Sequence, residues 1–196
     1  AIDRVLYGET RSPGELPAVE LENVAIGTEP DLFVAGGDAA FWENYGAFFG
    51  EVADHARGIL TERLGGPAPP ITLTATFAGF TGELGATKRE GLASIYRDHA
   101  DVLGLTYYPL RVEPASTTDY EFRMLPPDVV GAQVDAVVAR ARALEVEAGR
   151  ALPIVFKEVG YPTSAVNDAS EARQATFFEN FFASWDRYRD EVPYVS

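Results

Sequence analysis

The fold is decided by the stretch DVLGLTYY (residues 101–108) together with PIVFKEV (residues 153–159), which lies one long helix further along the chain. Both are short, nearly continuous apolar runs, which is typical of strands buried on both faces of a parallel sheet. Between them, residues 127–147 repeat valine, alanine and leucine at helical spacing, so one face of that helix is apolar. A strand, a helix and a second strand in this order predict a βαβ unit.

The same alternation extends towards both ends of the chain. Further strands are expected at 24–26, 71–77 and 193–196. Further helices are expected at 40–60, 88–99 and 170–188. Residues 111–126 are expected to form a long loop. The fold class is therefore α/β with a parallel sheet, and periodicity leaves open whether the sheet is doubly wound or part of an eight-stranded barrel.

Composition narrows the functional classes. The chain has 196 residues, of which 46% are hydrophobic, so it can bury the core of one ordinary domain. A net charge of −14 argues against binding to nucleic acid or to an anionic membrane, and no apolar run reaches the roughly 20 residues of a membrane helix. The chain has no cysteine, and neither His55 nor His99 has a second histidine at ligand spacing, so neither a metal site nor a cofactor is predicted.

Two of the expected strands carry a glutamate at or just past the end where α/β enzymes place their chemistry. Glu29 follows the first strand, and Glu158 lies in the fourth. Burying an ionised carboxylate costs several kcal/mol unless it is paired, so these side chains require an explanation. One explanation is structural, with each glutamate capping a loop or pairing with a buried arginine. The other is that the two carboxylates face one pocket.

Two carboxylates in one pocket are the minimum apparatus for cleaving a glycosidic bond. One carboxyl is held protonated and donates its proton to the leaving oxygen, and the other attacks the anomeric carbon. Aromatic side chains near the strand ends would stack on the C–H faces of a sugar. The candidates for this role are Phe80, Tyr107, Tyr108 and Tyr161.

Three segments resemble a known clan of enzymes. VAIGTEPD (residues 24–31), followed by FWENYGAFF (residues 41–49), is similar to the fourth-strand signature of the retaining glycosidases with (βα)8 barrels. DVLGLTYYPL (residues 101–110) resembles their sixth strand, especially that of the endo-β-1,4-galactanases of glycoside hydrolase family 53. PIVFKEVGYPTS (residues 153–164) resembles the seventh-strand segment that carries the nucleophile.

The resemblance implies specific roles. Glu29 would be the acid/base, Glu158 the nucleophile, and Tyr107 or Tyr108 the neighbour that orients it. Thr28 stands where the clan usually has an asparagine that binds the sugar 2-hydroxyl, although the mannanases of family 113 resemble this Gly-Thr-Glu form. The substrate would be a β-linked oligo- or polysaccharide, and an extracellular or cell-surface location would be expected. Residues 1–196 would then be a single catalytic domain, a partial TIM (β/α)8 barrel from about strand 4 to the start of strand 8 and incomplete at both ends.

Two rival functions follow from other features. A barrel that binds carbohydrate without cleaving it is favoured by Thr28. A Schiff-base aldolase would need a lysine at a strand end, and Lys157 has that position. Strand alternation puts Lys157 and Glu158 on opposite faces, so they are not expected to share a pocket.

Other residues are candidates for contact with a substrate or for packing. Asp31 is expected either to line the cleft or to serve the turn after the first strand. Arg111 and Tyr120 are possible sugar contacts, and Trp42 and Trp185 are expected to be packing residues.

Overall fold

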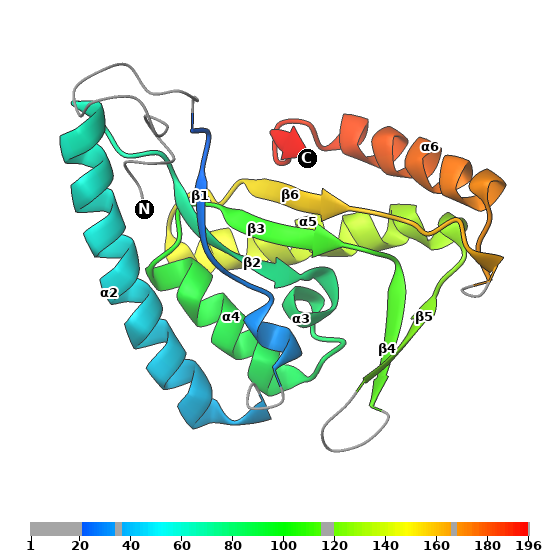
Figure 1. Ribbon diagram of the computed structural model, residues 1–196, viewed down its shortest axis with the longest axis horizontal. Coiled ribbons are helices and arrows are strands. Elements are labelled where there is room, and N and C mark those ends of the chain that lie inside the picture. The colour runs from blue at the N-terminus through cyan, green and yellow to red at the C-terminus, as the bar shows by residue number, and fades with distance from the viewer. Residues whose placement is uncertain (1–20, 34–36, 115–119, 166–167, 196) are drawn as a thin grey trace, which may run out of the picture.

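A computed structural model describes residues 21–33, 37–114, 120–165 and 168–195. Its centre is a five-stranded parallel sheet in which the strands are adjacent in chain order, β1-β2-β3-β6-β7 (Figure 1). The strands are β1 (Val24–Thr28), β2 (Ile71–Thr76), β3 (Leu103–Tyr107), β6 (Ile154–Val159) and β7 (Tyr194–Val195). The predicted α/β class and the five predicted strands are confirmed.

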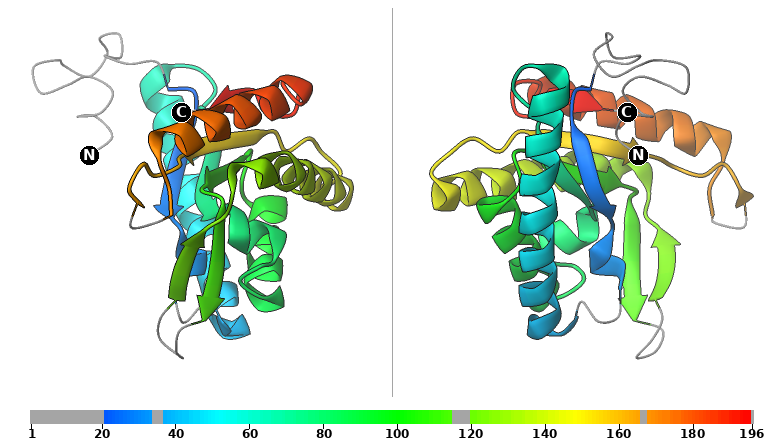
Figure 2. Two further views of the ribbon diagram at one scale, coloured as in Figure 1. Left: turned by 90° about the vertical axis from the view of Figure 1, so that its right-hand side faces the viewer. Right: turned by 60° about the vertical axis from the view of Figure 1, so that its left-hand side comes forward.

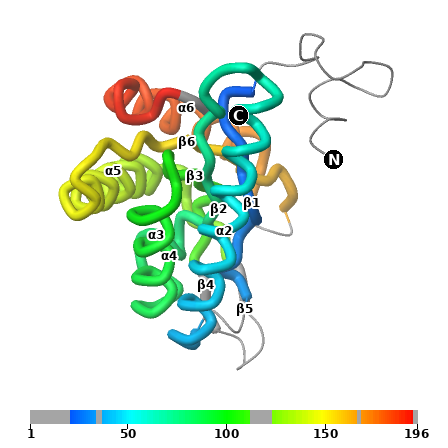
Figure 3. Tube along the Cα trace, turned by 90° about the vertical axis from the view of Figure 1, so that its left-hand side faces the viewer, coloured from blue at the N-terminus to red at the C-terminus, as the bar shows by residue number. Residues whose placement is uncertain are grey.

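The helices between these strands form one layer. They are α2 (Ala39–Leu64), α3 (Phe77–Thr81), α4 (Ala86–Asp98), α5 (Val130–Ala148) and α6 (Glu171–Arg187), with short 3-10 helices η1 (Pro30–Leu32) and η3 (Pro127–Val129). The long helices contact one another in chain order, α2 with α4, α4 with α5 and α5 with α6 (Figures 1 and 3). Because right-handed crossovers that always advance in one direction stay on one side, this order places the helices on the same face of the sheet. Within the described residues, none of the helices is both long and apolar enough to span a membrane.

A short helix and a β-hairpin were not predicted. The short helix α3 follows β2 directly, where the sequence indicated only the end of a strand. The segment expected to be a loop contains an antiparallel hairpin of β4 (Leu110–Pro114) and β5 (Tyr120–Met124). The hairpin projects beyond the end of β3, on the side of the sheet where the strands end (Figures 1 and 2).

The core lies between the sheet and the helix layer. In β2, the apolar side chains of Ile71, Leu73 and Ala75 are fully buried and belong to the main core cluster. The threonines that alternate with them, including Thr74 and Thr76, point to the other face of the sheet, which is the side of the site described below. Trp42 is buried and the indole N–H of Trp185 donates to the Val192 carbonyl, so both tryptophans are packing residues, as predicted.

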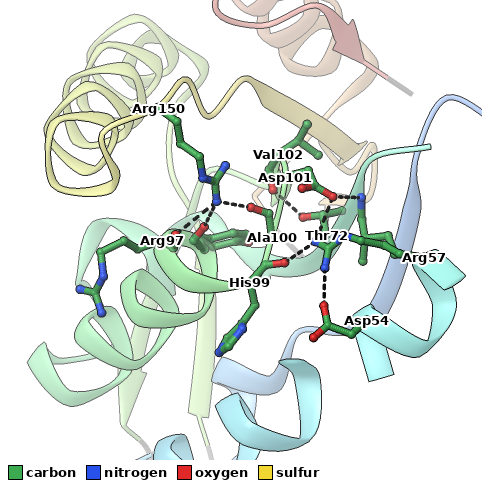
Figure 4. A network of polar contacts seen from close by, with 11 residues as sticks. Asp54, Arg57, Thr72, Arg97, His99, Ala100, Asp101, Val102 and Arg150 are labelled. Carbon is green, nitrogen blue, oxygen red and sulfur yellow. Dashed lines mark hydrogen bonds and ion pairs between the residues drawn. The ribbon is translucent and has the colours of Figure 1, made fainter. Parts of the chain in front are cut away.

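Hydrogen bonds and ion pairs of two arginines stabilise the amino-terminal end of the sheet, where the strands begin (Figure 4). Arg57 of α2 donates to the His99 carbonyl (2.6 Å) and to Asp101 Oδ2 (3.1 Å), and the same carboxylate oxygen accepts from the Ile71 N–H (2.8 Å). Arg150 donates to the carbonyl of Tyr96 in the last turn of α4 and to the carbonyl of Ala100, which follows that helix. The network therefore joins α2, β2, α4 and the start of β3. His99 also packs its ring on Gly50 and is only partly exposed, unlike His55, which is exposed.

We expect Arg57→Met to lower the free energy of unfolding by about 1–3 kcal/mol, because it removes charge-assisted hydrogen bonds from a partly buried site. Chemical denaturation measures this change. Arg189→Met is the matched control, since the Arg189–Asp186 pair is exposed and surface pairs contribute little. Equal effects of the two substitutions would contradict a structural role for the network.

Candidate active site

The first glutamate is positioned by an unusual end to β1. Gly27 has a left-handed backbone (φ 83°), and a Cβ there would lie 2.4 Å from the Tyr45 hydroxyl. Glu29 also adopts a left-handed conformation (φ 50°, ψ 48°), which is rare and costly for a residue with a side chain. Its N–H donates to the Thr74 carbonyl (2.6 Å), and its Oε1 accepts a hydrogen bond from the Thr106 hydroxyl (2.6 Å). The Glu29 side chain is therefore aimed across β2 towards β3.

The second glutamate lies in β6, opposite Thr106 in the register of β3 and β6. A bulge in that register leaves Lys157 as the extra residue between Phe156 and Glu158. The Tyr108 hydroxyl donates to Glu158 Oε2 (3.0 Å). The Tyr108 ring rests on Gly160, where a Cβ would lie 2.4 Å from the ring. The chain therefore needs glycine at position 160 to let Tyr108 reach Glu158.

Both glutamates line one pocket of about 260 Å³ at the carboxyl ends of the strands. The other residues that line it include Tyr108, Leu32, Phe77 and Leu110. The charges of both glutamates reach Tyr108. Its pKa is raised by partial burial, by the hydrogen bond to Glu158 and by the negative charge of Glu158 and Glu29. The sequence placed two carboxylates at strand ends, and the structure brings them to the same opening.

Of the four aromatic residues expected to contact a sugar, the structure places one at the pocket. Tyr108 lines the pocket, but Phe80, Tyr107 and Tyr161 are at most 4% exposed and belong to the core. Phe80 packs edge-on against Tyr96, Tyr107 stacks on Phe177 and Phe181, and the Tyr161 hydroxyl donates to the Leu125 carbonyl. Their rings have no free face for a sugar, so the prediction is wrong for these three. Thr28 is exposed at the end of β1 and is not one of the pocket-lining residues.

Lys157 does not line the pocket. Its ammonium group donates to Asn23 Oδ1 (2.7 Å), just before β1 begins. The bulge removes the strict alternation from which we expected Lys157 and Glu158 to lie on opposite faces, although the expected separation of Lys157 from the pocket holds. Arg111 is exposed in β4 and interacts electrostatically with Glu83, and the side chain of Tyr120 lies outside the described residues.

Tyr108, one of the two tyrosines expected to orient Glu158, does hydrogen-bond to it, whereas the residue that holds Glu29 was not predicted from the sequence. Thr106 is buried in β3 and donates to Glu29, and its position two residues before Tyr108 was the available signal. Thr76 ends β2, lines the pocket and caps α3 by accepting from the Gly79 N–H (2.9 Å). Asp31 is fully buried behind the site and does not line it.

Asp31 carries a pH dependence of stability. Burial raises its pKa from 3.8 to about 6, against the lowering effect of its hydrogen bonds from Thr76. The unfolded chain then ionises at lower pH than the folded chain, so stability falls as the pH rises from about 4 to about 6. We expect Asp31→Asn to remove this loss of stability. The difference in free energy of unfolding, Asp31→Asn minus wild type, should therefore increase by up to about 3 kcal/mol as the pH is raised from 4 to 7. Denaturation at several pH values measures the difference, and a difference that is constant with pH would contradict the assignment.

A second prediction concerns Gly160. If Glu158 is the nucleophile of the glycoside hydrolase proposed below, Gly160→Ala should push the Tyr108 ring away from it and lower kcat/KM about 10- to 100-fold, because small misplacements of a reacting group are costly. The free energy of unfolding should change little, since Tyr108 is 38% exposed. Gly58→Ala is the matched control, because a Cβ at this helical glycine meets nothing within 4 Å. Kinetics with aryl β-glycosides test the expectation, and normal turnover in Gly160→Ala would refute it.

The arrangement suits acid–base and nucleophilic chemistry by carboxylates. The described residues contain no group of three or more histidine, aspartate or glutamate side chains arranged to hold a metal ion. Comparisons with models of protein families, with curated proteins and with solved structures found no match to this chain.

Proposed function

We propose that the pocket is the active site of a glycoside hydrolase that cleaves a β-linked oligo- or polysaccharide with retention of configuration. The observation that carries the proposal is the meeting of Glu29 and Glu158 in one pocket from strands β1 and β6, with each carboxylate held by a neighbouring hydroxyl. Retaining glycosidases need two such carboxylates on opposite sides of the scissile bond.

Glu158 is the nucleophile in this proposal. Its Oε2 accepts from Tyr108, which fixes the carboxylate and leaves Oε1 to attack the anomeric carbon. The new bond joins Glu158 to that carbon while the bond to the leaving oxygen breaks, giving a covalent glycosyl–enzyme.

Glu29 is the proton donor and then the base. It transfers its proton to the leaving oxygen in the first step. In the second step it removes a proton from water, the water oxygen bonds to the anomeric carbon, and Glu158 leaves as a carboxylate. The Thr106 hydroxyl holds one oxygen of Glu29 through both steps, and the partly exposed side chains of Leu32 and Leu110 would contact the C–H faces of the sugar.

We infer further that the sheet is part of a (β/α)8 barrel, with β1, β2, β3, β6 and β7 in the places of its fourth to eighth strands. The support is the strand order, which follows the chain without reversal, and the helix layer, which follows the same order. The pocket lies at the carboxyl ends of the strands, as in TIM-barrel enzymes. The β4–β5 hairpin is then an addition after the sixth barrel strand.

The proposal is tested by following hydrolysis of 4-nitrophenyl β-glycosides of glucose, galactose, mannose and xylose, and of their disaccharides, by proton NMR. We expect the first reducing sugar released to be the β-anomer, which mutarotates later. Release of the α-anomer would exclude a retaining mechanism. Binding of the matching oligosaccharides without any hydrolysis would instead support the carbohydrate-binding alternative.

A further inference from the structure

A buried aspartate lies directly behind the proposed acid/base. Asp31 is two residues after Glu29, in η1, and is 0% exposed. Its carboxylate accepts from the Thr76 N–H (3.2 Å to Oδ1) and from the Thr76 hydroxyl. Because the Thr76 hydroxyl also accepts from the Gly79 N–H, its proton is directed at Asp31. The end of β1 is thus fastened to the end of β2 through one side chain.

The fit around this carboxylate is close. A Cβ at Gly79 would lie 2.2 Å from Asp31 Oδ2, so only glycine allows the aspartate to approach α3. Lys88 of α4, which is 2% exposed, donates to the Asp31 carbonyl and to the Phe33 carbonyl (3.1 Å). The segment that follows Glu29 is therefore held on one side by β2 and α3 and on the other by α4.

This fastening explains the backbone of Glu29. A left-handed backbone is strained for a residue with a side chain and persists only where its surroundings hold it. Glu29 is held before the turn by its own N–H to Thr74 and after the turn by Asp31. If the second anchor were released, residue 29 could return to an ordinary negative φ. That rotation would turn its side chain away from Thr106 and the pocket.

We propose that Asp31 is a positioning residue that acts through Thr76 to hold Glu29 in the left-handed conformation that aims its carboxylate into the pocket. The expected effect on catalysis rests on the proposed function, whereas the expected effect on the backbone of Glu29 does not. A buried carboxylate is an expensive anchor, and its retention here is explained by the placement of Glu29.

The structural consequence is tested by amide hydrogen exchange measured by NMR on the full chain. In Thr76→Val, which loses the hydroxyl, and in Gly79→Ala, which displaces the carboxylate, we expect the Glu29 amide to exchange at least about tenfold faster. Amides inside the sheet, such as that of Leu105, should keep their rates, whereas a merely structural loss would accelerate both. Thr76→Ser keeps the hydroxyl and should exchange like wild type.

Asp128→Asn is the matched control. Asp128 follows a proline at the start of η3, as Asp31 does in η1, but it is exposed. The Asp128→Asn substitution should leave the exchange rate of the Glu29 amide unchanged. The Asp31→Asn substitution should increase that rate without lowering the free energy of unfolding at pH 7. Unchanged exchange at Glu29 in Thr76→Val, Gly79→Ala and Asp31→Asn would overturn the inference.

The catalytic consequence is tested on the aryl β-glycosides. We expect Thr76→Val and Asp31→Asn to lower kcat about 10- to 100-fold with KM within about threefold of wild type, and Thr76→Ser to restore kcat. If wild type hydrolyses no glycoside, the proposed function fails while the exchange result still decides the positioning role. If wild type is active and these variants keep its kcat, only the inference fails.

Discussion

Glu158→Gln is expected to lower kcat on aryl β-glycosides by about 10³-fold or more, because an amide oxygen cannot form the covalent intermediate. The substitution keeps size and shape, and the glutamine oxygen can still accept from Tyr108 at the position of Oε2. Binding of oligosaccharide should therefore survive. Steady-state kinetics measure the loss, and isothermal titration with the intact oligosaccharide measures binding.

The control for this substitution is Glu62→Gln, an exposed glutamate on α2 that does not line the pocket. It should retain normal turnover. A Glu158→Gln variant with a rate near that of wild type would remove Glu158 from the mechanism, and loss of both turnover and folding would be recognised by denaturation.

Glu29→Ala is expected to have the second largest effect, about 10²- to 10⁴-fold in kcat on substrates with poor leaving groups, because both proton transfers are lost. Substrates with a 2,4-dinitrophenyl leaving group need no protonation, so their first step should remain fast and the glycosyl–enzyme should accumulate. Azide requires no general base, and it can occupy the space left by the side chain. We expect added azide to restore turnover and to yield the β-glycosyl azide.

The rescue separates a catalytic role from a structural one. Thr106→Ala, which removes only the hydrogen bond to Glu29 Oε1, should reduce kcat less and should not respond to azide. Failure of azide to accelerate Glu29→Ala, together with an unchanged requirement for leaving-group protonation, would contradict the assignment of Glu29 as proton donor.

The sequence predicted the sheet well because its signal is local. Residues 103–107 are buried on both faces, and a short, nearly continuous apolar run of this kind is typical of a strand inside a parallel sheet. The carboxyl ends of parallel strands share one edge of the sheet, so Glu29 and Glu158 could be placed together without knowing any contact. Both glutamates stand out because no folding requirement explains them there.

The incorrect predictions concern side chains whose burial depends on residues that are distant in the sequence and close in space. Tyr107 and Tyr108 are adjacent and point to opposite faces, and only the packing of Phe177 and Phe181 shows which one is buried. Phe80 lies in α3, a helix that begins where β2 ends, so its position near a strand end did not expose it. The role of Asp31 depends on Thr76, which is 45 residues away along the chain.

The central claim is that Glu158 attacks the substrate within the pocket it shares with Glu29, and trapping the intermediate tests it most directly. A 2,4-dinitrophenyl 2-deoxy-2-fluoro-β-glycoside of the sugar that the protein hydrolyses keeps the first step fast through its leaving group, while fluorine slows the second step. The account predicts that the intact mass of the protein increases by one fluoroglycosyl group and that peptide mapping finds this group on Glu158. A label on any other residue, or steady turnover of the natural linkage with no trapped intermediate, would contradict it.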